Sequence, residues 1–319
     1  MSEPTTAGAG SMADPDARRR LMAGVSATPG AAKPDPILTV DRITRTFGGM
    51  TAVDVEHLEV QRGVITALIG PNGAGKTTFF NLVTGFDKPS DGRAASWSFE
   101  GRTLSKTSAS SVAKAGMVRT FQLTKSLNRM TVLDNMMLGA RGQAGENLVK
   151  AMFRPAWAGQ EREVEAKARE LLQRFKLWEK RDDYAGSLSG GQRKLLEMAR
   201  ALMTDPTMIM LDEPMAGVNP ALTQSLLGHI QSLRDEGMTV LFVEHDMHMV
   251  RHISDWVVVM AEGRIVAEGP SDTVMSDPAV IDAYLGAHHD TDLGDDDLLS
   301  DEVMADLAQE AEQEGHEHG

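Results

Sequence analysis

The eight residues Gly70-Pro-Asn-Gly-Ala-Gly-Lys-Thr77 decide the fold of this 319-residue chain. They match the pattern G-x-x-x-x-G-K-[ST], follow the apolar run Gly63–Ile69 and precede a stretch with helical periodicity. Glycine lets the main chain adopt positive φ and approach a phosphate closely, and the N–H groups of the loop and the next helix attract an anion. The sequence therefore predicts a phosphate-binding loop between a buried strand and a helix. In this loop Lys76 can reach β- and γ-phosphates, and the Thr77 hydroxyl can bind Mg²⁺.

A second apolar strand ends in two carboxylates. Met208–Leu211 is followed directly by Asp212 and Glu213. A strand buried in a parallel sheet is apolar on both faces, and ligands in α/β proteins bind at the carboxyl ends of such strands. We expect Asp212 to hold Mg²⁺ and Glu213 to act as the general base that polarises a water molecule toward the γ-phosphate.

Strands and helices alternate through most of the chain, which predicts an α/β fold with a parallel sheet and crossover helices. The block Thr131–Tyr184 is instead charged and helical in pattern, so we expect an inserted helical subdomain at about 123–187. Within it, apolar residues recur at helical spacing and predict one buried face: Val164, Ala168, Leu171, Leu172 and Phe175. A hairpin is expected from Trp256–Met260 and Arg264–Glu268.

The net charge of −14 is concentrated at one end of the chain. Residues 288–319 contain 12 acidic residues and no lysine or arginine, whereas residues 36–287 are almost neutral. A neutral body argues against a nucleic-acid binder, which normally carries a basic surface. We therefore expect an unstructured leader at 1–35, a catalytic domain at 36–287 and an acidic, unstructured tail at 288–319.

Neither cysteine content nor hydropathy indicates a secreted or membrane-spanning protein. The chain has no cysteine, so it has no disulfide framework. We see no apolar run long enough to span a bilayer and no secretory signal at the start of the sequence. From these observations we expect a cytoplasmic compartment.

A further motif, Leu188-Ser-Gly-Gly-Gln192, resembles the signature sequence of the ATP-binding cassette (ABC) ATPases. Other positions match the family pattern in order. Gln122 stands where the family has its Q-loop glutamine, His245 matches the switch histidine, and Phe47 stands where an aromatic ring stacks on adenine. The D-loop position carries Asn219 where many members have aspartate, which puts that contact between subunits in doubt.

The resemblance implies a P-loop NTPase core of the ABC ATPase type, with an antiparallel β subdomain and the inserted helical subdomain. It implies ATP and Mg²⁺ as cofactors, and two cassettes that close head to tail around ATP. The implied catalytic residues are Glu213, His245, Gln122 and Lys76, and the implied metal-binding residues are Thr77, Gln122 and Asp212. The implied nucleotide-binding residues are Phe47, Gly70, Asn72, Gly73, Ala74, Gly75, Lys76, Thr77, Thr78, Ser189, Gly190, Gly191 and Gln192.

Within the family, the chain is most similar to the larger ATPase subunit of branched-chain amino acid importers. The residues that carry this likeness include Arg119-Thr-Phe-Gln122, Glu244-His-Asp-Met247 and Pro278–Gly286. The implied activity is ATP hydrolysis that powers import of branched-chain amino acids or related amides. The implied partners are integral-membrane permease subunits, a second cassette subunit and, indirectly, a solute-binding protein. The implied location is peripheral, on the cytoplasmic face of the inner or plasma membrane. The alternatives are the ATPase of a lipopolysaccharide-type exporter and a soluble ABC ATPase that takes no part in transport.

Overall fold

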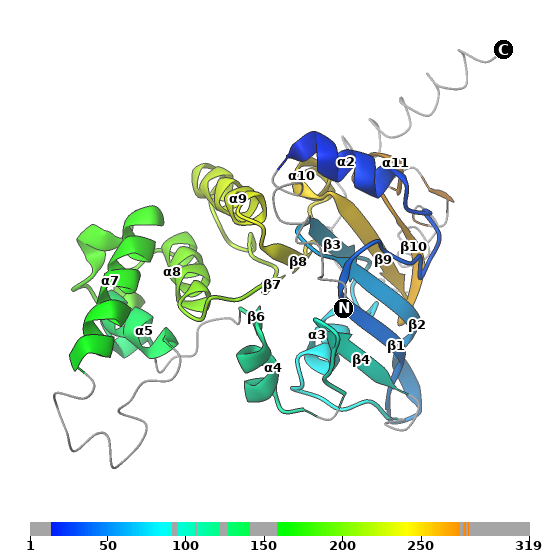
Figure 1. Cartoon of the computed structure of the whole chain (residues 1–319), viewed down its shortest axis with the longest axis horizontal. Helices are drawn as coiled ribbons and strands as arrows, with labels where there is room; N and C mark the ends of the chain where they lie inside the picture. The colour runs from blue at the N-terminus through cyan, green and yellow to red at the C-terminus, as the bar shows by residue number, and fades with distance from the viewer. Residues whose placement is uncertain are drawn as a thin grey trace, which may run out of the picture. The chain divides into compact units, whose positions relative to one another are not determined.

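The computed structural model describes residues 14–90, 95–105, 107–120, 127–140, 158–274, 277–278 and 280. A six-stranded sheet with the order β10-β9-β3-β8-β7-β6 forms its centre (Figure 1). Its strands are β3 (Ile65–Ile69), β6 (Met117–Arg119), β7 (Met208–Asp212), β8 (Thr239–Val243), β9 (Trp256–Ala261) and β10 (Arg264–Gly269). Neighbouring strands pair in parallel, except that β10 pairs antiparallel with β9.

The register of the central strands brings three loops together. All residues of β3 and β8 are buried, as their mostly apolar sequences predict. Leu68 of β3 and Asp212 of β7 both pair with Val243, the last residue of β8. Because parallel strands end at the same edge of a sheet, the loops that follow β3, β7 and β8 begin side by side.

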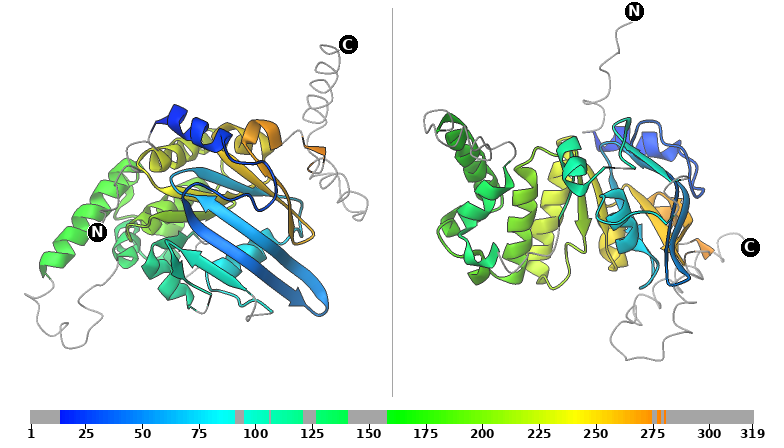
Figure 2. Two further views of the ribbon diagram at one scale, coloured as in Figure 1. Left: turned by 45° about the vertical axis from the view of Figure 1, so that its right-hand side comes forward. Right: turned by 90° about the horizontal axis from the view of Figure 1, so that it is seen from below.

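A second, antiparallel sheet has the order β2-β1-β4-β5 and packs on the first through a shared apolar core (Figure 2). Its strands are β1 (Pro36–Phe47), β2 (Met50–Gln61), β4 (Ser96–Phe99) and β5 (Arg102–Thr103). β1 and β2 form a long hairpin whose buried residues alternate along much of each strand, as expected for a sheet with one covered face. This sheet is the antiparallel β subdomain that the sequence resemblance implied.

Helices connect the strands or form a separate group. The connecting helices are α3 (Lys76–Val83), α4 (Ala109–Ala115), α9 (Pro220–Asp235), α10 (Met247–Ile253) and α11 (Ser271–Val274). The group beside the sheet contains α5 (Val132–Gly139), α7 (Ala158–Arg174) and α8 (Gly190–Leu202), which pack on one another. Short 3₁₀ turns at Leu127–Arg129, Trp178–Lys180 and Ala185–Ser187 link these helices.

The predicted apolar face of the charged helical block is confirmed. Ala168, Leu171, Leu172 and Phe175 are buried on and just after α7. Val164, near the start of the helix, is only partly buried. The predicted hairpin is also confirmed: β9 and β10 pair, and Glu262 and Gly263 adopt positive φ in the turn between them.

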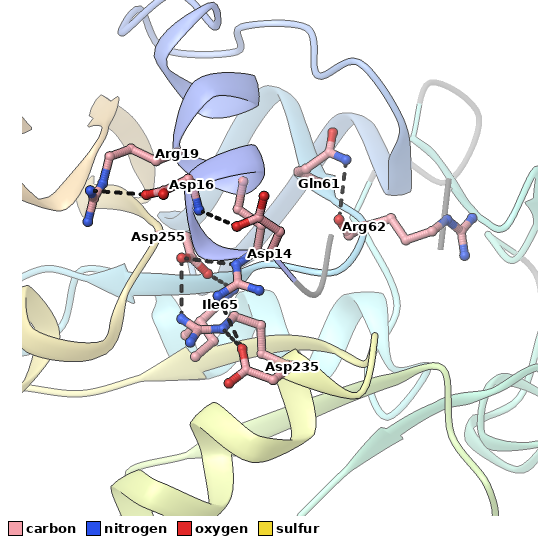
Figure 3. A network of polar contacts seen from close by, with 10 residues as sticks. Asp14, Asp16, Arg19, Gln61, Arg62, Ile65, Asp235 and Asp255 are labelled. Carbon is pink, nitrogen blue, oxygen red and sulfur yellow. Dashed lines mark hydrogen bonds and ion pairs between the residues drawn. The ribbon is translucent and has the colours of Figure 1, made fainter. Parts of the chain in front are cut away.

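Residues 14–35 depart from the expectation of an unstructured leader at 1–35. They include the helix α2 (Pro15–Ala23), which begins with the Asp14 side chain accepting a hydrogen bond from the Asp16 N–H. Arg18 on this helix is buried, with its guanidinium 3.1 Å from the Asp235 carboxylate at the end of α9. Asp255, which precedes β9, belongs to the same polar network (Figure 3).

Two buried anchors explain why this polar, Ala- and Gly-rich segment packs on the domain. Met22 adds to the shared apolar core. Lys33 lies completely buried, with its Nζ 2.9 Å from the Glu268 carboxylate and 4.6 Å from the centre of the Trp256 ring. Composition predicts disorder where a segment cannot bury apolar surface, but it cannot detect single long-range charge pairs. The folded domain therefore begins before residue 36.

Candidate functional site

The Gly70–Lys76 loop, between β3 and α3, requires glycine at two positions for steric reasons. Gly70 has φ 148° and Gly75 has φ 98°. A Cβ atom at Gly70 would lie 2.0 Å from the Met260 carbonyl oxygen, and one at Gly75 would lie 2.2 Å from the Ala52 carbonyl oxygen. Any side chain at either position would displace a neighbouring strand, so the loop can hold this shape only with glycine.

The start of α3 is suited to bind an anion. Its first N–H groups have no side-chain cap, because the capping position is Gly75. Uncapped N–H groups and the positive end of the helix dipole attract phosphate. Thr77 is exposed and Thr78 is partly exposed on the first turn.

The Lys76 ammonium is folded back on its own loop. It donates to the carbonyl oxygen of Pro71 at 2.9 Å and to that of Gly70. Burial lowers the pKa of Lys76, and the nearby charges of Glu213 and Asp212 oppose that shift. Among the described residues the hydrogen-bond partners of this buried cation are neutral carbonyl groups. Such a cation gains from an added anion, so the loop has the chemistry of a phosphate site.

Asp212, the last residue of β7, is held from the neighbouring strand. The Arg119 guanidinium, at the end of β6, forms an ion pair with the Asp212 carboxylate. Arg119 also donates to the Asn81 side chain on α3 at 2.6 Å. These contacts link α3 to β6 and β7. Arg119 and Asn81 were not predicted as site residues, although Arg119 stands in the stretch Arg119-Thr-Phe-Gln122 that carried the family resemblance.

Glu213 and His245 meet although 32 positions separate them in the chain. The Glu213 Oε1 lies 2.8 Å from the His245 Nε2. Glu213 has a left-handed φ of 47°, and its N–H donates to the Val243 carbonyl at 3.0 Å. Its carbonyl oxygen accepts from the Lys194 Nζ of α8 at 3.0 Å. The pair stands at the adjacent ends of β7 and β8, where the sequence placed a general base and a switch histidine.

The Ser189–Gln192 motif begins α8 with reciprocal hydrogen bonds. The Ser189 Oγ accepts from the Gln192 N–H at 3.3 Å, and the Gln192 Oε1 accepts from the Ser189 N–H at 3.0 Å. Both side chains are exposed or partly exposed. Among the described residues, no hydrogen bond joins this motif to the Gly70–Lys76 loop.

Of the two remaining predicted residues, Phe47 is described by the structure and Gln122 is not. Phe47 ends β1, and 49% of its surface is exposed. The Arg45 guanidinium lies 4.4 Å from the centre of the Phe47 ring and is fixed by Asp87, whose carboxylate accepts from Arg45 Nε at 2.9 Å. One face of the ring is thus covered by an arginine. Gln122 lies outside the described residues, as do 123–126 and 141–157 of the predicted helical subdomain and the predicted tail.

The donor set around Asp212 fits a magnesium ion only together with a nucleotide. Across the described parts of the chain, no three His, Cys, Asp or Glu side chains cluster closely enough to hold a metal ion. Mg²⁺ in phosphate-transfer sites takes one or two protein oxygens and completes its shell with phosphate and water. Thr77 and Asp212 can supply those protein oxygens beside the anion site.

Comparisons with known proteins identify the class of protein that this fold and site define. Residues 53–216 match the family described as ABC transporter, and residues 264–290 match the family described as branched-chain amino acid ATP-binding cassette transporter. The chain belongs to the ABC transporter family. This finding confirms the resemblance that the Ser189–Gln192 motif and the Gly70–Thr77 loop indicated.

The similar curated proteins carry one common description. A probable branched-chain amino acid transport ATP-binding protein LivG of Archaeoglobus fulgidus is 39% identical over 79% of this chain and 96% of its own length. The high-affinity branched-chain amino acid transport ATP-binding protein BraF of Pseudomonas aeruginosa is 40% identical over 79% of this chain and 98% of its own. LivG of Escherichia coli is 38% identical with the same coverage.

Solved structures support the same assignment. A nucleotide-free ATP-binding cassette from an ABC transporter is 38% identical, superposes with a TM-score of 0.68 and covers 78% of this chain and 98% of its own. The ADP conformation of another ATP-binding cassette superposes with a TM-score of 0.67 at 38% identity, over 79% and 99% of the two chains. No helix in the described parts of this chain is both long enough and apolar enough to span a membrane.

Proposed function

We propose that this chain binds and hydrolyses ATP and that the hydrolysis powers an importer of branched-chain amino acids. The observation that carries the proposal is the meeting of Glu213 and His245 beside Asp212, next to the loop that ends in Lys76. The descriptions of LivG and BraF support the transported substrate. They favour an importer over the exporter and the soluble ATPase that the sequence left open.

Different residues bind the phosphates, the metal ion and the adenine ring of ATP. Lys76 leaves its loop carbonyls to bind the β- and γ-phosphates, and the N–H groups at the start of α3 bind phosphate oxygens. Thr77, Asp212 and Gln122 would hold Mg²⁺, which would neutralise charge on the phosphate oxygens. Phe47 stacks on the adenine ring through the face that Arg45 leaves open.

The hydrolytic step belongs to Glu213 and His245. A water molecule attacks the γ-phosphorus in line with the leaving oxygen, and the Glu213 carboxylate orients that water and accepts its proton. The hydrogen bond at 2.8 Å between the His245 Nε2 and the Glu213 carboxylate holds that carboxylate in place. In the nucleotide-bound state His245 would contact the γ-phosphate. Burial by a second subunit would exclude bulk water from these partly exposed groups.

The proposed assembly pairs two cassettes and adds membrane-spanning subunits. Among the residues that the structure describes, no hydrogen bond joins the Ser189–Gln192 motif to the Gly70–Lys76 loop. We propose that each motif meets the loop of a second cassette across a head-to-tail dimer, the arrangement that the family resemblance implies. Membrane-spanning permease subunits supply the translocation path, and a solute-binding protein delivers the amino acid to them. The chain works on the cytoplasmic face of the membrane, and nucleic acid is not a partner.

Transport in cells tests the proposal directly. Deletion of the gene from its source organism should abolish high-affinity uptake of radiolabelled leucine, isoleucine and valine. Wild-type protein should restore uptake, and the matched variant Glu213→Gln, expressed to the same level, should not. Uptake of an unrelated sugar serves as the control. Unchanged amino acid uptake in the deletion strain would refute the assigned substrate.

A further inference from the structure

Glu244 is a buried carboxylate between the two loops that carry the hydrolytic residues. It follows Val243, the last residue of β8, and precedes His245. Only 5% of its surface is exposed, although the neighbouring Glu213 and His245 side chains are partly open to solvent. The mechanism described above gives Glu244 no role.

Its two oxygen atoms bind two different loops. The Oε1 atom accepts from the Met215 N–H at 2.8 Å, and the Oε2 atom accepts from the His245 N–H at 3.2 Å. Met215 lies two residues after Glu213 in the loop that follows β7, and His245 lies in the loop that follows β8. One side chain therefore ties both loops close to the residues whose side chains meet at 2.8 Å.

The main chain of Glu213 needs such support. A left-handed φ of 47° is unfavourable for a residue with a Cβ atom, and it persists only where neighbouring contacts enforce it. The Val243 carbonyl oxygen accepts from the Glu213 N–H, and the Lys194 Nζ donates to the Glu213 carbonyl oxygen. Two residues further along the same loop, the Met215 N–H donates a hydrogen bond to the Glu244 carboxylate.

A carboxylate matches this task better than other side chains. It offers acceptor oxygens on both branches, whereas an amide offers an acceptor on one branch and a donor on the other. Burial raises the pKa of Glu244, and the two main-chain N–H groups oppose that rise. Burial disfavours the charged form of Glu244. Its two hydrogen bonds to main-chain N–H groups hold the two loops in position.

We propose that Glu244 is a positioning residue that sets the loop after β7 against the loop after β8 and so fixes the Glu213–His245 pair for hydrolysis. The proposal rests on the proposed ATPase activity. Glu244 acts through its two main-chain contacts and does not touch the nucleotide. Its loss therefore lowers kcat and leaves nucleotide binding at the Gly70–Lys76 loop intact.

Steady-state kinetics and calorimetry on the full chain test this role. Glu244→Ala removes both acceptors, and we expect kcat for ATP to fall about 100-fold, the loss that a misplacement of about 1 Å produces in a catalytic group. Glu244→Gln keeps the shape and one acceptor, and we expect a loss of about 10-fold, because one of the two tethers remains. ATP affinity should stay within about twofold in both variants, because a change confined to the transition state leaves ground-state binding unaltered.

Glu268→Gln is the matched control. Glu268 is equally buried and also accepts a main-chain N–H, that of Ala31 at 2.7 Å, but it lies on β10 and contacts neither hydrolytic loop. Its kcat should remain at the wild-type value even if the melting temperature falls. If Glu244→Ala does not fold, Glu244→Gln decides the question: a wild-type kcat in that variant would overturn the proposal.

A coupling measurement separates positioning from general damage. In the background of His245→Ala, which already lacks the pair, Glu244→Gln should cost little further activity, because residues that act as one unit are not additive. A full additional loss in that background would overturn the proposal. Failure of the proposed function looks different, since the wild-type chain would then hydrolyse no ATP at all.

Discussion

At the residue scale, the adjacent carboxylates Asp212 and Glu213 contact different partners. Asp212 is held by Arg119 of β6, whereas Glu213 turns toward His245 at the end of β8. Side chains of consecutive residues in a strand point to opposite faces, and the left-handed φ of Glu213 redirects the chain immediately after the strand ends. The two carboxylates are thus directed to different partners, as the proposed division between a metal-binding Asp212 and a water-orienting Glu213 requires.

Glu213→Gln should separate binding from hydrolysis. Glutamine keeps the size of the side chain but cannot accept a proton from water, so kcat should fall by about 10²–10⁴-fold. ATP affinity should be retained, and the nucleotide-bound dimer should accumulate on a sizing column. Turnover near the wild-type rate would exclude Glu213 as the general base.

Lys76→Ala should act on binding itself. The variant removes the cation that would leave the Pro71 and Gly70 carbonyls for the phosphates. Affinity for ATP, measured by calorimetry, should fall by at least about tenfold, since a charge-assisted hydrogen bond to phosphate contributes about 1.5–3 kcal/mol. Exposed Lys88→Ala, outside the loop, is the control and should bind ATP normally. Equal affinities in the two variants would contradict the role of Lys76.

At the element scale, α9 joins the hydrolytic loops to the helical group. Asn219 begins this helix, and its Oδ1 accepts from the Leu222 N–H at 3.0 Å. The asparagine that departs from the family pattern is therefore a helix cap, a role for which asparagine and aspartate are equally suited. At the other end of α9, the guanidinium of Arg174, the last residue of α7, bridges Ser232 and Glu236.

The contact between α7 and α9 should weaken in acid. His229 of α9 lies 4.4 Å from Phe175, ring centre to ring centre. Burial lowers the pKa of His229, and the nearby cations Arg174 and Lys176 lower it further. Because the unfolded chain then binds a proton more readily than the folded chain, stability is complete above the unfolded pKa of about 6.5 and falls as the pH drops toward the lower folded value.

Urea denaturation at pH 7.5 and pH 5.5 measures this effect. His229→Gln should lose less free energy of unfolding between the two pH values than the wild type does. His252→Gln changes an exposed histidine of α10 and should behave like the wild type. An identical pH dependence in His229→Gln and the wild type would rule out this linkage.

At the scale of the whole molecule, residues 14–35 act as a clasp, by which we mean the segment that carries Arg18 and Lys33. Arg18 reaches the end of α9 and the start of β9, and Lys33 reaches Glu268 on β10. The clasp thus joins elements that are more than 200 positions away in the chain. Its contacts lie apart from the hydrolytic residues.

Lys33→Met should destabilise the domain without changing ATP hydrolysis. The variant leaves the fully buried Glu268 carboxylate without its counter-charge, and loss of one partner of a buried pair costs about 3–5 kcal/mol. The free energy of unfolding in urea should fall by that amount, and Lys33→Met combined with Glu268→Gln should regain part of it. Arg19→Met, at an exposed ion pair of α2, should change stability by less than about 1 kcal/mol.

The local patterns of the chain determined most of the fold and the sequence positions of the candidate site residues. Glycine spacing indicated the loop before α3, and mostly apolar runs indicated β3, β7 and β8. The two carboxylates stand at the end of β7, the strand end at which ligands bind in such sheets. The helical block was recognised by its period, since Ala168, Leu172 and Phe175 share one face. These features depend on neighbours within a few residues, which a single sequence displays.

Only the tertiary structure decided which distant residues meet. Arg119 with Asp212, Glu244 with the Met215 N–H, and Lys33 with Glu268 are each joined across tens to hundreds of positions, and no periodicity encodes such pairs. The folded part of the leader was missed for the same reason. A buried charge is stable only where an oppositely charged partner lies beside it. The order and register of the strands determine which residues become such neighbours.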